Sequence, residues 1–296
     1  MKGTVLITGA KGFIGTELSR QLKALDYKVI GMDMIDSPDE EKAGEYIKFN
    51  ISDEGLEKVL PENLTAIVHL AGLSRDPDCR DKLQDTFKIN VLSTIKLLDA
   101  AKAKGTKQFI FASSEWVYGE TKGHELKDEE SAIEILKLET EYAISKAVCE
   151  GAIKQKYRRG FCDVTICRFG IVYGPRPNKM TAVEGIFENI RTKDTVEVGA
   201  LKSGRCFVHV EDLARGIIAS IGVKGYETIN LVGPKVNTIE AIVEASKKIT
   251  GKNPKVVETN PDGFNVRNVS NKKAIELIKW QPKYSLEEGM RTLLPK

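Results

Sequence analysis

The hydrophobic pattern near the N-terminus changes from a continuous apolar run to a helical spacing and back. Residues 5–7 are apolar without interruption, and residues 29–32 form a second such run. Between them the apolar positions recur every three or four residues, at Ile14, Leu18, Leu22 and Leu25. Short apolar runs are typical of strands buried on both faces of a parallel sheet, whereas the longer spacing indicates an amphipathic helix. The segment therefore predicts strand, helix and strand.

The same alternation continues through the first half of the chain. Further strand-like runs lie at 47–49, 66–70, 108–112 and 164–168, and a helical pattern covers 90–103. Repeated strand–helix–strand units predict an α/β fold, a Rossmann-like doubly wound parallel sheet with right-handed crossovers. Ligands of such sheets bind at the carboxyl ends of the strands, so the residues that follow these runs are the functional candidates.

The regular alternation ends near Gly174. Beyond it we predict a helix at 181–191, a strand at 228–232 and a helix at 239–249 that Gly251 stops. We therefore expect a second, smaller C-terminal lobe.

A glycine-rich turn joins the first predicted strand to the first predicted helix. Gly9 permits the tight turn, Gly12 lets the backbone approach a pyrophosphate, and Gly15 lets the helix pack close to the strand. The phosphates then meet N–H groups at a helix N-terminus. Asp33 ends the second strand, where a carboxylate binds the ribose hydroxyls of a dinucleotide. No arginine follows Asp33 in the next three residues, so we expect NAD to bind more tightly than NADP.

Composition and charge exclude several functional classes. The chain is 41% hydrophobic and 29% charged, with a net charge of +3 and both signs interleaved, so we expect neither a nucleic-acid-binding face nor a basic membrane-binding tail. No apolar run approaches the ~18 residues of a membrane span, and the first strand begins at once, so we expect a cytoplasmic protein. The five cysteines are scattered, and His69, His124 and His209 lack metal-ligand spacing, so we expect no metal site.

Three side chains favour a proton-transfer chemistry. Tyr142 and Lys146 are four residues apart and so share a helix face, and Ser114 follows a strand-like run. An unperturbed tyrosine, with a pKa of about 10, is too weakly ionised to act as a base at neutral pH. A nearby ammonium, aided by a nicotinium ring, favours the phenolate and lowers that pKa. We therefore predict that Tyr142 takes a proton from a sugar hydroxyl while hydride leaves for the nicotinamide, and that Ser114 orients that oxygen.

Taken together, these features resemble the extended short-chain dehydrogenase/reductases of the nucleotide-sugar epimerase/dehydratase group. The resemblance runs nearly end to end. The motifs that carry it are 8–15 (TGAKGFIG), 69–72 (HLAG), 90–94 (NVLST), 113–119 (SSEWVYG), 142–146 (YAISK), 168–176 (RFGIVYGPR), 205–212 (RCFVHVED) and 280–282 (WQP).

The resemblance implies NAD as cofactor, a nucleotide-sugar as substrate, and catalysis by Ser114, Tyr142 and Lys146. The residues it assigns to NAD are Gly9, Gly12, Phe13, Ile14, Gly15, Asp33, Asn50, Ile51, Leu70, Ala71, Gly72, Asn90, Tyr142 and Lys146. Those it assigns to the substrate are Ser74, Ser114, Glu115, Tyr142, Arg205 and Arg267. Both arginines would clamp the substrate diphosphate, a task suited to the planar guanidinium; the alternative is that they are solvated surface residues.

The resemblance also implies a domain division and a dimer. The NAD-binding domain would span 1–174 and the substrate-binding lobe 175–296, with the chain crossing back near 205–232. Family members commonly dimerise through the helix near Asn90 and the helix that carries Tyr142. The apolar positions outside a single core stripe that fit such a homodimer are Ile135, Leu138, Val148 and Ile153.

Three positions depart from the family pattern. Asn50 stands where an aspartate commonly precedes the adenine contact, and Cys206 stands where aspartate is common. Ile171 replaces an asparagine that often reaches the substrate. The missing amide removes a polar anchor, so the substrate is either bound differently or is not a conventional diphospho-sugar.

Among the possible activities the sequence favours an epimerase, of the 4-epimerase type, working through a transient keto-sugar. Epimerisation needs only reversible hydride transfer and rotation of the keto-sugar. A 4,6-dehydratase needs an acid and a base, and Trp116 after Glu115 does not supply the second carboxylate. A sugar dehydrogenase or keto-sugar reductase remains an alternative. A dinucleotide-sensing regulatory protein is the non-enzymatic one, although a sensor has no need of Tyr142 and Lys146.

Overall fold

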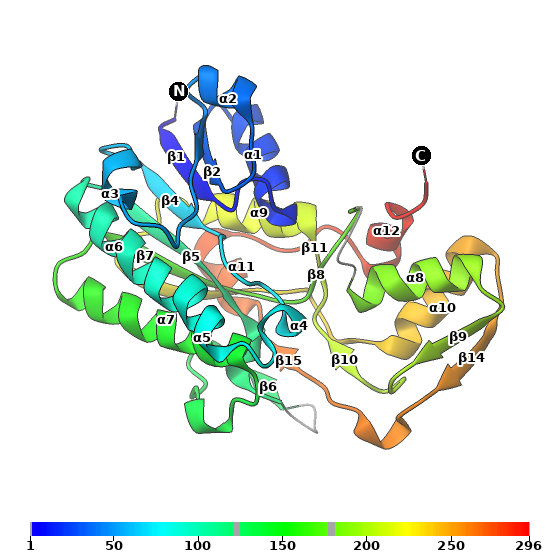
Figure 1. The fold of residues 1–296 in the computed structure, drawn as a ribbon. Coiled ribbons are helices and arrows are strands. Elements are labelled where there is room, and N and C mark those ends of the chain that lie inside the picture. The colour runs from blue at the N-terminus through cyan, green and yellow to red at the C-terminus, as the bar shows by residue number, and fades with distance from the viewer. Residues whose placement is uncertain (1, 121–124, 177–180, 296) are drawn as a thin grey trace. The chain divides into compact units, whose positions relative to one another are not determined.

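The computed structural model describes residues 2–120, 125–176 and 181–295 (Figure 1). The chain forms two compact units. Unit 1 comprises Met1–Gly119, Ala132–Arg168 and Ala214–Ile229, and unit 2 comprises Glu120–Ser131, Phe169–Leu213 and Asn230–Lys296. The prediction was a cut at 174 with the chain crossing back near 205–232. In this division the first long stretch of unit 1 is interrupted by Glu120–Ser131 and ends at Arg168, and the chain returns to unit 1 over Ala214–Ile229. His124 lies outside the described residues.

A seven-stranded sheet is the central element of the fold, with the order β12-β7-β5-β4-β1-β2-β3. The pairs from β3 to β5 are parallel, and Val5 lies opposite both Val29 and Ala66. The strands are β1 (Thr4–Thr8), β2 (Lys28–Asp33), β3 (Tyr46–Lys48), β4 (Ala66–His69), β5 (Gln108–Ser114), β7 (Asp163–Phe169) and β12 (Tyr226–Leu231). From β1 the chain adds β2 and β3 on one side of the sheet, and then crosses to add β4 and β5 on the other side. The point between β1 and β4 where the strand order reverses is where ligands of such sheets bind. The predicted Rossmann-like fold is confirmed.

Helices connect these strands. They are α1 (Phe13–Ala24), α2 (Pro38–Lys42), α3 (Leu56–Val59), α4 (Asp76–Cys79), α5 (Leu83–Thr86), the π-helix η1 (Phe87–Leu92), α6 (Ser93–Ala103), the 3₁₀ turns η2 (Glu115–Tyr118) and η3 (Ile135–Lys137), α7 (Glu141–Arg158) and α9 (Val210–Ala219). Helices α6 and α7 lie side by side (Figure 1). No helix in the described ranges has the length and apolar character to cross a membrane.

The helix predicted at 90–103 needs a correction. The helical run begins earlier, at Leu83, and Asn90 lies inside the π-helical turn η1 rather than at a helix start. A π turn adds one residue to the helical repeat, so the apolar spacing alone does not show where the run begins. Such turns are frequent at functional sites.

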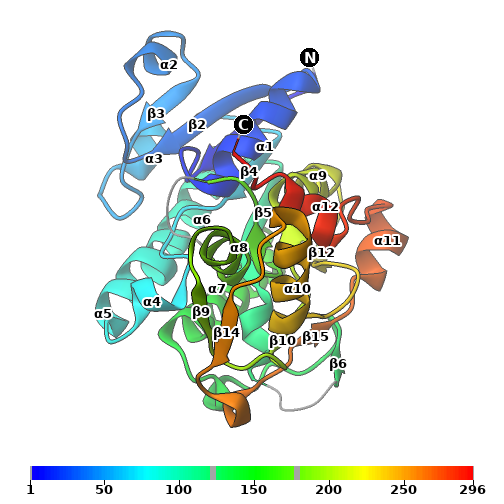
Figure 2. The same cartoon turned by 90° about the vertical axis from the view of Figure 1, so that its right-hand side faces the viewer.

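Unit 2 contains a helix pair and several short strand pairs. Helices α8 (Ala182–Thr192) and α10 (Ile239–Thr250) lie side by side, and β9 (Thr195–Val198) pairs in parallel with β14 (Lys255–Glu258) (Figure 2). The remaining elements are β6 (Leu126–Lys127), β8 (Val172–Tyr173), β10 (Gly204–Arg205), β11 (Val208–His209), β13 (Asn237–Thr238), η4 (Pro261–Gly263), β15 (Asn268–Val269), α11 (Lys272–Ile278) and α12 (Leu286–Arg291). Gly251 ends α10 with φ +69°, as the sequence predicts.

A buried ion pair joins several elements of unit 1. Arg168 on β7 donates to both carboxylate oxygens of Glu150 on α7, at 3.0 and 2.7 Å, and the two side chains are only 6% and 8% exposed. The Ser113 hydroxyl on β5 donates to Glu150 Oε1 at 2.5 Å. Arg168 Nη1 donates to the Tyr118 hydroxyl of η2 at 2.8 Å. The carboxylate is thus hydrogen-bonded on both oxygens, as a buried charge requires.

Breaking this pair should cost far more than breaking an exposed one. We expect Arg168→Met to lower the free energy of unfolding by about 3–5 kcal/mol, because it leaves a buried carboxylate without its counter-charge. The double variant Arg168→Met/Glu150→Leu should lose less, since no charge then remains buried. Arg20→Met, which breaks the exposed pair with Glu17, is the control and should lose less than about 1 kcal/mol. Urea unfolding followed by circular dichroism measures these differences, and equal losses for the two single variants would contradict the expectation.

Candidate active site

The glycine-rich turn forms a tight cradle between β1 and α1. Gly9 has φ +72°, and its N–H donates to the Met32 carbonyl at 2.8 Å. A Cβ atom at position 15 would lie 2.2 Å from the Gly9 carbonyl oxygen, which is closer than real contacts allow. Gly15 is therefore the residue that lets α1 begin directly against the turn.

The N-terminus of α1 fits a bound diphosphate. Its N-cap is Gly12, which has no side chain to cap the first-turn N–H groups, and the first turn, beginning with Phe13 and Ile14, holds no acidic residue. The helix dipole and these N–H groups favour an anion at this end. The cradle therefore suits the pyrophosphate of a dinucleotide.

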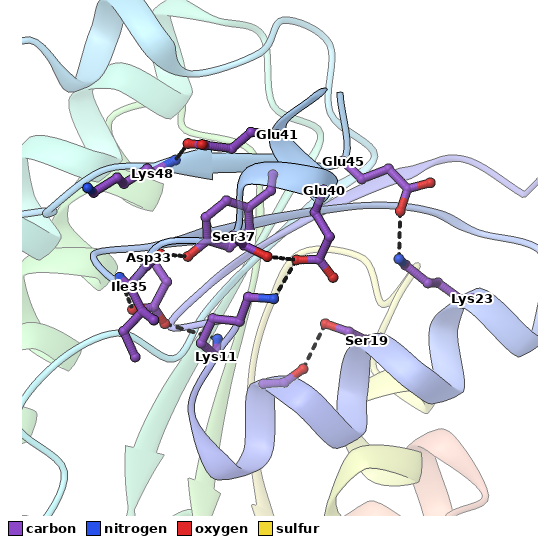
Figure 3. Close-up of polar contacts among 12 residues, drawn as sticks. Lys11, Ser19, Lys23, Asp33, Ile35, Ser37, Glu40, Glu41, Glu45 and Lys48 are labelled. Atoms are coloured by element: carbon purple, nitrogen blue, oxygen red, sulfur yellow. Dashed lines mark hydrogen bonds and ion pairs between the residues drawn. The ribbon is translucent and has the colours of Figure 1, made fainter. Parts of the chain in front are cut away.

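Asp33 lies at the carboxyl end of β2, next to the cradle (Figure 3). Its Oδ2 accepts the backbone N–H of Lys11 at 3.0 Å, and its Oδ1 accepts that of Ile35 at 3.3 Å. The carboxylate is thus oriented by two N–H groups and keeps acceptor capacity for ribose hydroxyls. Asn50 Oδ1 accepts the Ser52 N–H at 3.0 Å.

The end of β4 adjoins the same cradle. The Thr8 hydroxyl bonds to His69 Nδ1 at 2.7 Å and accepts the Ala71 N–H at 3.2 Å. Burial lowers the pKa of His69 to about 3, so the ring is neutral at physiological pH. These bonds fix the start of the 70–72 segment, which we predict to line the dinucleotide. By contrast, Ile51, another predicted contact, packs in the core of unit 1.

Asn90 links the loop after β4 to α7. Its Oδ1 accepts the Leu73 N–H at 2.8 Å, and its Nδ2 donates to the Leu73 carbonyl at 3.1 Å and to Ser145 Oγ at 3.0 Å. A Cβ on Gly72 would lie 2.8 Å from Asn90 Oδ1. The structure therefore gives Asn90 a positioning role, and its direct contact with the dinucleotide stays a prediction.

The three predicted catalytic side chains come together in unit 1. Ser114 ends β5, and α7 carries Tyr142 and Lys146 one turn apart. The Ser114 side chain is hydrogen-bonded to Tyr142. Lys146 Nζ donates to the Ala112 carbonyl at 2.8 Å and lies 5.8 Å from the centre of the Tyr142 ring. Phenol, hydroxyl and ammonium thus share one neighbourhood.

Burial is the largest cause of the pKa shifts of Tyr142 and Lys146. It raises the pKa of Tyr142 to about 12, although the hydrogen bond with Ser114 lowers it. Burial also lowers the pKa of Lys146. The sequence led us to expect a lowered phenol pKa; the structure shows the opposite, because loss of hydration outweighs the neighbouring groups. Extra positive charge at the site is what would favour the phenolate.

The other predicted substrate residues of unit 1 differ in exposure. Glu115 is fully buried, and its charge raises the pKa of Tyr142. Trp116 meets the Tyr142 ring edge-on, with centroids 6.3 Å apart. Ser74 is exposed in the loop after β4. The substrate contacts of Glu115 and Ser74 stay predictions.

In unit 2 the two predicted substrate arginines share one carboxylate. Arg205 Nη2 lies 3.5 Å from Glu120 Oε2, and Arg267 Nη2 pairs with Glu120 Oε1. Arg205 Nη1 also donates to the Asn265 carbonyl at 3.0 Å. Arg267 is completely buried, so the alternative of a solvated surface residue is wrong for it.

The sequence analysis did not identify Glu150 or Glu120 as partners of arginines. Glu150 follows Lys146 by one helical turn, so helical spacing could have placed it on the same face, but no local pattern connects it to Arg168. Glu120 is 147 residues from Arg267, so no local pattern connects them.

Comparison with known proteins agrees with this geometry. The family model described as NAD dependent epimerase/dehydratase family matches residues 5–231. The chain is 30% identical to UDP-glucose 4-epimerase 4 of Oryza sativa subsp. japonica, over 97% of this chain and 88% of that protein. It is 28% identical to UDP-N-acetyl-alpha-D-glucosaminuronate decarboxylase of Bacillus cytotoxicus, over 98% and 96%. UDP-glucuronic acid 4-epimerase from Bacillus cereus, in complex with UDP-glucuronic acid and NAD, superposes with a TM-score of 0.83 at 26% identity, over 98% and 97%.

The matched segment contains the glycine cradle, Asp33 and the neighbourhood of Tyr142. The protein is thus an enzyme of the extended short-chain dehydrogenase/reductase type, and NAD is its cofactor. The cradle of unit 1 fits that cofactor, because its uncapped helix N-terminus and close glycine contacts suit a pyrophosphate. The chain belongs to the NAD-dependent epimerase/dehydratase family.

Proposed function

We propose that this enzyme is an NAD-dependent nucleotide-sugar 4-epimerase of the cytoplasm. The observation that carries the proposal is the buried group of Tyr142, Ser114 and Lys146, in a chain similar over 97% of its length to a UDP-glucose 4-epimerase. The similarity to a decarboxylase acting on a UDP-sugar supports the substrate class. It also makes decarboxylation an outcome to test.

In this proposal Tyr142 moves the proton. Its phenolate oxygen accepts the proton of the sugar 4-hydroxyl, and Ser114 donates a hydrogen bond that holds the same sugar oxygen in place. Bound NAD would supply the hydride acceptor, a positive charge and, after the keto-sugar rotates, the hydride that returns to the opposite face of C4. Tyr142 then returns its proton to the sugar oxygen.

In this proposal Lys146 stabilises the Tyr142 phenolate by its positive charge. Its ammonium is fixed by the Ala112 carbonyl and lies over the Phe111 ring, 4.9 Å from the ring centre. Burial of both groups strengthens their electrostatic interaction, since little water screens it. The ammonium and the cofactor charge together oppose the desolvation that raises the phenol pKa.

We propose that Arg205 and Arg267 bind the substrate diphosphate. Both guanidinium groups meet the Glu120 carboxylate in the structure, so binding the diphosphate would require them to exchange Glu120 for phosphate oxygens, which accept the same charge-assisted hydrogen bonds. The aliphatic Ile171 leaves the sugar without one polar anchor that relatives of this type often have.

Products separate the candidate reactions. We expect incubation with a panel of UDP-sugars to give a product of unchanged mass with an inverted C4 centre, read by mass spectrometry and NMR. Consumption of stoichiometric NAD would instead indicate a dehydrogenase, loss of water a dehydratase, and loss of carbon dioxide a decarboxylase. A protein that binds NAD and changes no sugar would support the sensor alternative.

Substitution of the phenol should abolish turnover without releasing the cofactor. We expect Tyr142→Phe to remove nearly all kcat while NAD stays bound, and Ser114→Ala to cost less, within the ~10²–10⁴-fold typical of a general acid–base group. Lys146→Ala should weaken both kcat and NAD binding. Measurement of kcat and cofactor content checks these expectations, and a fully active Tyr142→Phe enzyme would overturn the mechanism.

Glu115→Gln tests the role of the buried acid. An epimerase should tolerate it, because its proton transfers run through Tyr142, whereas a dehydratase that uses Glu115 as its acid should lose activity. The same kcat assay measures it. A dead Glu115→Gln enzyme with a normal fold by circular dichroism would favour the dehydratase.

We also propose a homodimer formed by the α6 and α7 region. Leu92 in η1 is 53% exposed and Ile135 is 45% exposed, so apolar side chains are available there. Leu138 and Ile153, which we expected to contribute, are buried within unit 1 and do not. Light scattering at micromolar concentration should give twice the chain mass, and a monomer would count against this proposal.

A further inference from the structure

A lysine of the glycine cradle lies beside the carboxylate proposed to bind the adenosine ribose. Lys11 lies between Gly9 and Gly12, and its backbone N–H donates to Asp33 Oδ2 at 3.0 Å. Its flexible four-carbon stem therefore starts next to the ribose hydroxyls in the proposed NAD site. A compact ammonium on such a stem is a common phosphate ligand, so this lysine alone would favour a dinucleotide with a 2′-phosphate.

In the structure the Lys11 ammonium is engaged by a second carboxylate. Lys11 Nζ pairs with Glu40 Oε2 on α2, and the Ser37 hydroxyl donates to the same oxygen at 2.7 Å (Figure 3). The hydrogen bonds from Lys11 and Ser37 lower the pKa of Glu40, so the carboxylate is charged at neutral pH.

The buried side chain of Tyr46 lies beside the Lys11–Glu40 ion pair. Lys11 Nζ lies 5.1 Å from the centre of the Tyr46 ring, and the Tyr46 hydroxyl donates to the Ile35 carbonyl. Tyr46 is 5% exposed and so anchors the segment between Asp33 and Glu40. Burial raises the pKa of Tyr46 to about 12, and the charges of Asp33 and Glu40 act in the same direction.

We propose that Glu40 is a second determinant of the preference for NAD over NADP, acting by engaging the Lys11 ammonium. The inference rests on the proposed role of Asp33. With Glu40 charged, the site holds two carboxylates: Asp33 accepts the Lys11 backbone N–H, and Glu40 pairs with the Lys11 ammonium. A 2′-phosphate then meets two negative charges beside an ammonium that Glu40 already engages, whereas the uncharged 2′-hydroxyl of NAD can donate a hydrogen bond to Asp33. Specificity is the difference between these two affinities.

The experiment compares the binding of NAD and NADP to three variants by calorimetry. Glu40→Gln removes the charge, keeps the side-chain length and leaves an amide oxygen for Ser37. Asp39→Asn is the matched control, because it removes the same charge from an exposed neighbour on α2 whose carboxylate is not the one that pairs with Lys11. The double variant Lys11→Ala/Glu40→Gln removes the ammonium as well. Circular dichroism checks each fold.

We expect the ratio of Kd for NADP to Kd for NAD to fall about two- to fivefold in Glu40→Gln, a size typical of a partly exposed charge pair. The Kd for NAD itself should change less than that ratio. Asp39→Asn should keep the wild-type ratio, and the double variant should lose the gain. Adenosine 2′,5′-bisphosphate, compared with adenosine 5′-monophosphate, should show the same pattern, and salt should weaken it.

Two outcomes overturn this inference and leave the role of Asp33 untouched. One is an unchanged ratio of Kd for NADP to Kd for NAD in Glu40→Gln with NAD still bound, and the other is an equal fall of that ratio in Asp39→Asn. Equal or stronger binding of NADP by the unmodified protein would overturn the assignment of Asp33 as well. Loss of NAD binding in Glu40→Gln would show that the pair only supports the fold, and also rejects the proposal. Failure of the unmodified protein to act on any sugar would reject the proposed function and leave the cofactor result standing.

Discussion

The buried pair of Glu150 and Arg168 is the interaction on which the arrangement of the proposed catalytic groups depends. It connects β7 to α7 directly, to β5 through Ser113 and to η2 through Tyr118. Ser113 precedes Ser114, and Glu150 lies one helical turn beyond Lys146. The elements that carry the serine and the lysine are thus fixed by the same carboxylate. Since an unpaired buried charge is costly, any shift of one element against another is resisted.

The same exclusion of water sets the chemistry of the reacting groups. Burial raises the pKa of the Tyr142 phenol and lowers that of the Lys146 ammonium, so both charged forms are disfavoured unless they face each other or another charge. A phenolate therefore becomes accessible when positive charge accumulates around it. In the proposed mechanism, proton transfer would thus depend on the positive charge of the bound cofactor, so the phenolate forms when hydride transfer can follow.

The sequence predicted what local patterns determine. The cradle of Gly9, Gly12 and Gly15 was predictable because close approach and positive φ demand glycine at fixed positions in a strand–turn–helix. The shared face of Tyr142 and Lys146 follows from helical spacing. The π turn around Asn90 was not predictable, because one inserted residue changes the register without changing the apolar character of the segment.

Contacts between residues far apart in the chain could not be predicted from the sequence, for a different reason. The buried Arg267 is paired with Glu120, and the Lys11 ammonium is paired with Glu40. The residues next to Glu40 in the chain look like ordinary solvated residues. Charged residues are abundant on any surface, so composition does not indicate which ones meet. The fold decides these pairings, and with them the local electrostatics around Arg267 in unit 2 and around Lys11 in unit 1.

Two ion pairs of unit 1 show how burial divides the functions of charge. Arg168 and Glu150 are shielded from water, so their pairing governs stability and geometry. Lys11 and Glu40 are 28% and 40% exposed, so their pairing contributes little to stability. A contact of small energy is nevertheless large enough to shift a choice between two cofactors that differ by one phosphate, because specificity depends on a difference and not on the total binding energy. The partly exposed pair can therefore change by substitution at little cost to the fold, whereas the buried pair cannot.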